Sequence, residues 1–167
     1  KLIKTVLALA LATALLPCVP ALGEARYPTL NGALTDDASA LGQTVAGDIA
    51  AYAEKVEAAA GVQLHVALVL FLDGEPVQTY ADTLFSRWAL GGDGLLLLGA
   101  AAEDSFALCA GENVEAKLSE ASLTSLLYAS GFSDAFKTQR YDAAFGAFFV
   151  AFNDLLNRQY GTQVELG

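Results

Sequence analysis

Few side chains of this sequence could act as a nucleophile or move a proton. The chain has one histidine and two cysteines, and both His65 and Cys109 stand inside apolar runs. Nucleophilic catalysis requires a serine, threonine or cysteine beside a base. The sequence has no G-x-S-x-G, no C-x-x-C, no histidine pair for zinc and no Walker loop. We therefore expect His65 to be a core histidine and Cys109 to be a small buried residue. A catalytic or metal-binding His65 and a reactive Cys109 thiol stay open as alternatives.

Carboxylates are the abundant polar groups of the chain. Acidic residues outnumber basic ones by 19 to 9, and the formal net charge is -10. This balance argues against a nucleic acid partner, which requires clustered lysine and arginine. Carboxylates in loops suit hard cations such as Ca²⁺ or Mg²⁺, although no EF-hand pattern is present. Paired carboxylates would also serve a glycosidase, and no spacing supports or excludes that class. Solvated turns and helix caps are the simpler explanation for six of them: Asp36, Asp37, Asp93, Glu103, Asp104 and Asp142.

The N-terminal residues have the pattern of a secretory signal peptide. Lys1 and Lys4 flank an apolar run that reaches residue 16, and Ala21-Leu22-Gly23 places small residues before a cut at Glu24. The run is shorter than the ~20 residues of a bilayer span, which disfavours an uncleaved anchor. A proline before the first cysteine disfavours a lipoprotein site. We therefore expect a signal peptide over residues 1–23 and an exported, monomeric single domain over residues 24–167.

Cleavage at that point changes the charge and the thiol content of the chain. It removes two lysines and no acid, so the net charge goes from -10 to -12. It also leaves Cys109 as the single thiol, so no intramolecular disulfide can form. The mature fold must then depend on its apolar core.

The spacing of apolar residues predicts an alternation of helices and strands. Residues 24–35 lack periodicity and are expected to form a loop ending in a capping Thr35 or Asp36. The strands have no polar face, so helices must cover both sides of the sheet. We therefore predict a three-layer α/β/α sandwich with a small mixed sheet of about 3–4 strands. The expected helices span residues 37–60, 76–88, 120–129, 133–137 and 141–160, and the expected strands span 62–72, 95–100 and 105–110, the last two as an antiparallel hairpin.

Several short motifs occur in the order and spacing of the TPM domain family. The matching segments are Gly-Val-Gln before an aliphatic strand at 61–69, Asp-Gly at 73–74, Tyr-Ala to Phe-Ser-Arg-Trp at 80–88, Asp-Gly before an aliphatic strand at 93–98, and Tyr-Asp-Ala-Ala at 141–144. The chain resembles this family from about Tyr27 to Tyr160. The family includes a thylakoid-lumen phosphatase-like protein, a photosystem II repair protein, a modulator of acetylcholine receptors and many exported bacterial proteins. Two segments depart from the family pattern: the loop 89–93 is shorter, and Gly111-Glu112-Asn113 stands where Gly-Tyr-Gly is common.

The resemblance implies an α/β/α fold and two alternative functions. The first is a non-catalytic accessory domain, often tethered to a membrane beyond its C-terminus, that assists the assembly or maintenance of membrane protein complexes. The second is a divalent-cation-dependent acid phosphatase acting on phosphate monoesters, in which acidic loops hold Ca²⁺ or Mg²⁺ beside a phosphate-containing ligand. Asp36, Asp93 and Asp142 are the expected metal contacts, and no nucleophile or general acid is assigned. We expect the first function, because the sequence shows no groups arranged for proton transfer apart from carboxylates.

Overall fold

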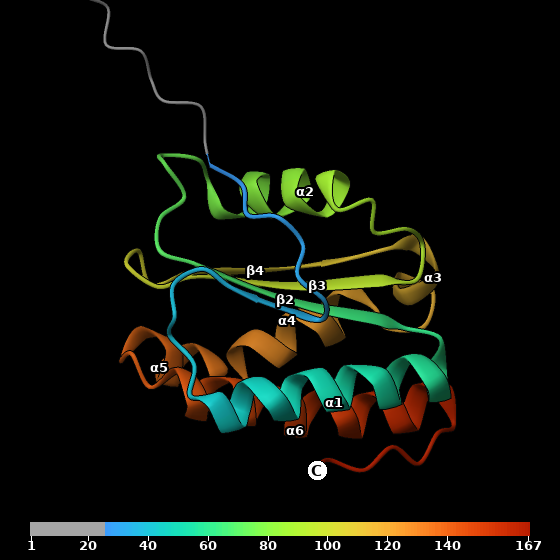
Figure 1. Ribbon diagram of the computed structural model, residues 1–167. Coiled ribbons are helices and arrows are strands. Elements are labelled where there is room, and N and C mark those ends of the chain that lie inside the picture. Colours follow the sequence, from blue (N-terminus) through green and yellow to red (C-terminus); the bar gives the residue numbers. More distant parts are fainter. Residues whose placement is uncertain (1–25) are drawn as a thin grey trace, which may run out of the picture.

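One mixed sheet of four strands organises the molecule. The computed structural model describes residues 26–167 (Figure 1). Strands that are neighbours in the sheet are also neighbours in the sequence. The first three run parallel and the last pairs antiparallel with the third. The strands are β1 (Leu34–Asp36), β2 (Gln63–Val69), β3 (Gly94–Ala100) and β4 (Ser105–Ala110).

Helices cover both faces of the sheet, as predicted. One helix, α2, lies on one face, whereas α1, α4, α5 and α6 lie on the other (Figure 1). Each face has its own apolar cluster. The three-layer α/β/α sandwich is therefore confirmed. The helices are α1 (Gln43–Ala60), α2 (Val77–Arg87), α3 (Glu112–Glu115), α4 (Glu120–Tyr128), α5 (Phe132–Lys137) and α6 (Tyr141–Tyr160).

The residue types of β3 and α6 explain how the sheet and this helix pack together. All seven residues of β3 are buried, because the strand has a neighbour on each side and helices over both faces. In α6, aromatic residues at spacings of three and four form one buried face toward the sheet. They are Phe145, Phe148, Phe149 and Phe152.

The start of the described chain forms a strap across α2. The Tyr80 hydroxyl donates a hydrogen bond to the Arg26 carbonyl at 2.6 Å, and the Trp88 indole N–H donates to the Pro28 carbonyl at 3.0 Å. The Tyr27 hydroxyl donates to Glu75 at 2.6 Å. The lead-in predicted as a loop is therefore fixed to the face that carries a single helix.

The structure contains two short elements that were not predicted, β1 and α3, and it moves the start of α1. The strand β1 lies within residues predicted as a loop and its cap, and α1 begins at Gln43 instead of residue 37. The Asp36 carboxylate accepts the N–H groups of Ala40 and Leu41 at 3.1 and 3.0 Å, so it holds a turn after β1 and does not cap a helix. The single-turn helix α3 was not predicted.

The apolar run of the first predicted strand, residues 62–72, continues past the end of β2. That strand ends at Val69, and the next two side chains, Leu70 and Phe71, are 48% and 54% exposed.

Within residues 26–167, no helix combines the length and the hydrophobicity that a membrane crossing would require. The predicted signal peptide lies outside the described residues.

Candidate functional site

Two of the three predicted metal contacts lie at the same end of the sheet. Asp142, in the first turn of α6, accepts the N–H of Gly42 at 3.0 Å. Gly42 directly precedes α1 and follows Leu41, whose N–H is held by Asp36. The two carboxylates thus accept hydrogen bonds from consecutive backbone amides. Asp142 also places its negative charge at the amino ends of two helices, where it is stabilising.

The third predicted metal contact lies at the opposite end. Asp93 directly precedes β3 and accepts a hydrogen bond from the Asn113 side chain at 2.9 Å. Because Asp36 lies beside Leu68, and Gly94 lies beside Gln63, five residues of strand, about 16 Å, separate the two ends. The three aspartates therefore do not converge on one point. No group of three histidine, cysteine or acidic side chains within residues 26–167 has the geometry of a metal site, and cation binding stays a prediction.

His65 has a structural partner at the edge of the core. Its Nδ1 lies 3.1 Å from the carbonyl oxygen of Gly32, and its ring lies edge-on to Trp88. Burial lowers the pKa of His65 below its ordinary 6.5, against smaller opposing effects of the Gly32 carbonyl and Glu57. Burial thus favours the neutral form of the ring. It is half-buried, which is less than the prediction of a core histidine implied.

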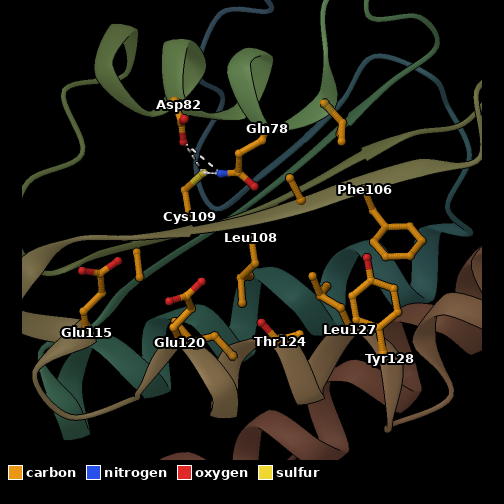
Figure 2. A pocket seen from close by; sticks show the side chains of 14 residues that line it. Gln78, Asp82, Phe106, Leu108, Cys109, Glu115, Glu120, Thr124, Leu127 and Tyr128 are labelled. Atoms are coloured by element: carbon orange, nitrogen blue, oxygen red, sulfur yellow. Dashed lines mark hydrogen bonds between the residues drawn. The ribbon is translucent and has the colours of Figure 1, made fainter.

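A groove of 540 Å³ runs along β4, on the side of the strand that has no neighbour (Figure 2). Side chains of α2 form one wall and side chains of α4 form the other. The α4 wall is mainly apolar and ends in Tyr128, which is 61% exposed. Exposed carboxylates occur on both walls and near one end: Asp82 from α2, Glu120 from α4 and Glu115 from α3.

Cys109 contributes its side chain to the α2 side of the groove. Its thiol donates a hydrogen bond to Asp82 at 3.2 Å and accepts one from the Gln78 amide at 3.2 Å (Figure 2). Gln78 also donates to Asp82 at 3.0 Å. Burial raises the pKa of the Cys109 thiol to about 12, and the hydrogen bond to Asp82 adds to the rise. The prediction that Cys109 is a small buried residue is confirmed.

The raised pKa of Cys109 predicts slow alkylation. A pKa of about 12 in place of 9.0 leaves about a thousandfold less thiolate at neutral pH. We expect iodoacetamide to modify Cys109 at least about tenfold more slowly in the folded chain than in the same chain in concentrated urea. Mass spectrometry of the peptides measures Cys109 separately from Cys18. Equal rates in the two states would show that the thiol is reactive.

The sequence prediction missed this groove as a site. Its walls come from α2 and α4, and its floor comes from β4, so its residues are distant in the sequence. One signal was available: residues 105–110 were predicted as the second strand of a hairpin, and no later segment was predicted as a strand that could pair with its other edge. The metal prediction directed attention to the strand ends instead.

Comparison with known proteins decides the family. The model of the TPM domain family matches residues 34–155. The chain belongs to the TPM domain family. This TPM domain also has the fold of two solution NMR structures. The N-terminal domain of a protein from P. gingivalis is 16% identical, with 77% of this chain and 84% of that chain covered and a TM-score of 0.70. The N-terminal domain of the cg2496 protein from Corynebacterium glutamicum is 16% identical, with 86% and 89% covered and a TM-score of 0.61. No curated protein matches the TPM domain described here.

The two segments that depart from the family pattern contact each other in this TPM domain. The N–H of Asn113 donates to the Gly92 carbonyl at 2.9 Å, and the N–H of Gly111 donates to the Gly94 carbonyl at 2.8 Å. The Asn113 side chain adds the bond to Asp93 described above. The short loop and the segment after β4 are thus one packed unit at the amino end of β3.

Proposed function

We propose that this TPM domain is an exported, non-catalytic accessory domain that binds a partner protein during the assembly or maintenance of a membrane protein complex. The groove beside β4 carries the proposal. It joins a free strand edge, an apolar wall and exposed carboxylates on one surface, which is a combination suited to binding a polypeptide.

The surroundings of Cys109 and His65 also support a binding role. Cys109 is hydrogen bonded to Asp82 and has a raised pKa, so it is a poor nucleophile. His65 faces the Gly32 carbonyl and Trp88, and lies outside the groove. The two side chains therefore do not form a pair of nucleophile and base.

The alternative is a Ca²⁺- or Mg²⁺-dependent acid phosphatase acting on phosphate monoesters. Asp36 and Asp142 are the two acids that the structure brings near each other for such a site, although both already accept backbone hydrogen bonds. To hold a metal ion that activates water, the two carboxylates would have to release those hydrogen bonds or coordinate the ion through their remaining lone pairs.

Phosphatase activity is tested by the turnover of para-nitrophenyl phosphate with and without Ca²⁺ or Mg²⁺. We expect no turnover above that of an Asp36→Ala, Asp142→Ala double variant. A Glu54→Ala variant, on the exposed surface of α1, controls for loss of charge. Metal-stimulated turnover that the double variant loses and the control keeps would overturn the non-catalytic proposal.

The accessory role is tested in the cells that encode the chain. Native gel electrophoresis of membranes from a deletion strain should show less of at least one assembled complex. The unaltered chain should restore the complex. Unchanged membrane complexes in the deletion strain would overturn the accessory role.

A further inference from the structure

The free edge of β4 has unpaired backbone groups at alternate residues. The N–H of Gly111 donates to the carbonyl of Gly94 at 2.8 Å, and Gly111 lies opposite Gly94 in the continued register of β3 and β4. Backbone groups alternate in direction along an antiparallel strand. Residues 105, 107 and 109 therefore bond to β3, whereas the N–H and C=O groups of Phe106, Leu108 and Ala110 point away from it.

Within residues 26–167, β4 pairs with β3 alone, and no other backbone hydrogen bond involves these outward groups. The groove lies along them, and its walls extend above and below the strand (Figure 2). A free strand edge is a template for pairing with another chain. At the opposite edge of the sheet, β1 has only three residues and offers a much shorter template.

We propose that β4 binds an extended, basic segment of a partner protein as a fifth strand of the sheet. This inference rests on the proposed function and names the chemistry of the partner. Three N–H donors and three C=O acceptors of β4 would pair with the backbone of the segment. Alternate side chains of the added strand would face α2 on one side and α4 on the other.

The charges beside the groove select a basic segment. Asp82, Glu115 and Glu120 are exposed and line it, and the whole chain has a net charge of -10. Lysine or arginine in the bound strand would face these carboxylates, and apolar residues would contact Leu123 and Leu127 of α4. A second copy of this chain is disfavoured as the occupant, because pairing of two β4 edges would bring the same carboxylates together.

The test uses short acetylated peptides in which lysine alternates with valine. One peptide carries N-methyl groups on the amides that would face β4, and a second carries them on the alternate amides. A third has glutamate in place of lysine. We expect the unmethylated peptide to shift the NMR signals of the Phe106, Leu108 and Ala110 amides and to slow their hydrogen exchange. The peptide methylated on the alternate amides should keep this binding, whereas the peptide methylated on the amides that face β4 and the glutamate peptide should lose it.

Protein variants test the same contacts from the other side. Ala110→Pro removes one outward N–H without removing a bond to β3, and is expected to weaken peptide binding about tenfold. Thr124→Trp, at an exposed position of α4, fills the groove and should also weaken binding if the proline variant fails to fold. Glu120→Lys should weaken binding at low salt, whereas Glu54→Lys, exposed on α1, should not.

Several outcomes would overturn strand addition. They are equal binding of both methylated peptides, equal binding of the glutamate peptide, no shift of the three amides, or a dimer in sedimentation that Ala110→Pro abolishes. These results are separate from the test of the accessory role. If the peptide fails to bind while the membrane complexes still depend on the chain, the accessory role stands and only strand addition fails. If metal-stimulated phosphatase turnover is found, the proposed function fails whatever the peptide does.

Discussion

Replacement of Phe132 by alanine is expected to lower the free energy of unfolding by about 3–5 kcal/mol. Phe132 is fully buried at the start of α5. Its ring contacts Phe106, Phe136, Phe145 and Phe148, with centroids 5.1 to 5.9 Å apart. The substitution removes the ring that joins β4, α5 and α6, and leaves a cavity that surrounding rings fill only in part. Urea unfolding followed by circular dichroism measures the loss.

Phe71→Ala is the matched control for this prediction. It deletes the same atoms from a ring that is 54% exposed after β2. We expect a much smaller loss of stability, because about half of the surface of Phe71 already contacts solvent. Equal losses for Phe71→Ala and Phe132→Ala would contradict the central role of the Phe132 ring.

Gly111→Ala is expected to destabilise the fold by about 1–3 kcal/mol through overpacking. A Cβ at this position would lie 2.3 Å from the carbonyl oxygen of Gly91 and 2.4 Å from that of Gly92. These are backbone atoms, which cannot rotate away as a flexible side chain would. The loop 91–93 must therefore move, and the bond from Gly111 to Gly94 is weakened. Urea unfolding measures the loss, and the NMR signal of the Asn113 side chain reports the displacement.

Gly91→Ala is the control for the same loop. A Cβ on Gly91 meets no atom within 4 Å, and the backbone of Gly91 does not have a positive φ. The same added methyl group should therefore leave the stability almost unchanged. If Gly91→Ala is as destabilising as Gly111→Ala, the close approach is not the cause.

The sequence predicted the elements that are long or fully buried. The long helix α6 and the buried strand β3 have clear apolar patterns and were placed almost to the residue. The strand β1 has three residues, too few for an alternating pattern, and it forms because β2 pairs with it. The late start of α1 depends on the side chain of Asp36, which binds the turn at residues 40 and 41.

The candidate site was harder to predict than the fold. The metal prediction chose Asp36, Asp93 and Asp142 for their places in loops, but the strand β1, which ends at Asp36, was not predicted. Because β1, β2 and β3 are parallel, Asp36 at the end of β1 and Asp93 just before β3 lie at opposite ends of the sheet. The groove depends on backbone groups that carry no sequence signal and on walls brought together by tertiary packing.

The order of strands in the sheet has a consequence for synthesis of the protein from its N-terminus. All four strands are present once Ala110 has been made, and each pairs with the strand made just before it. The face under α4, α5 and α6 then still lacks most of its cover, and α6 begins only at Tyr141. A chain stopped between these points would have a complete sheet with one apolar face covered mainly by α1 alone. Incomplete chains of this protein should therefore be prone to aggregate and to require a chaperone until the last helix is made.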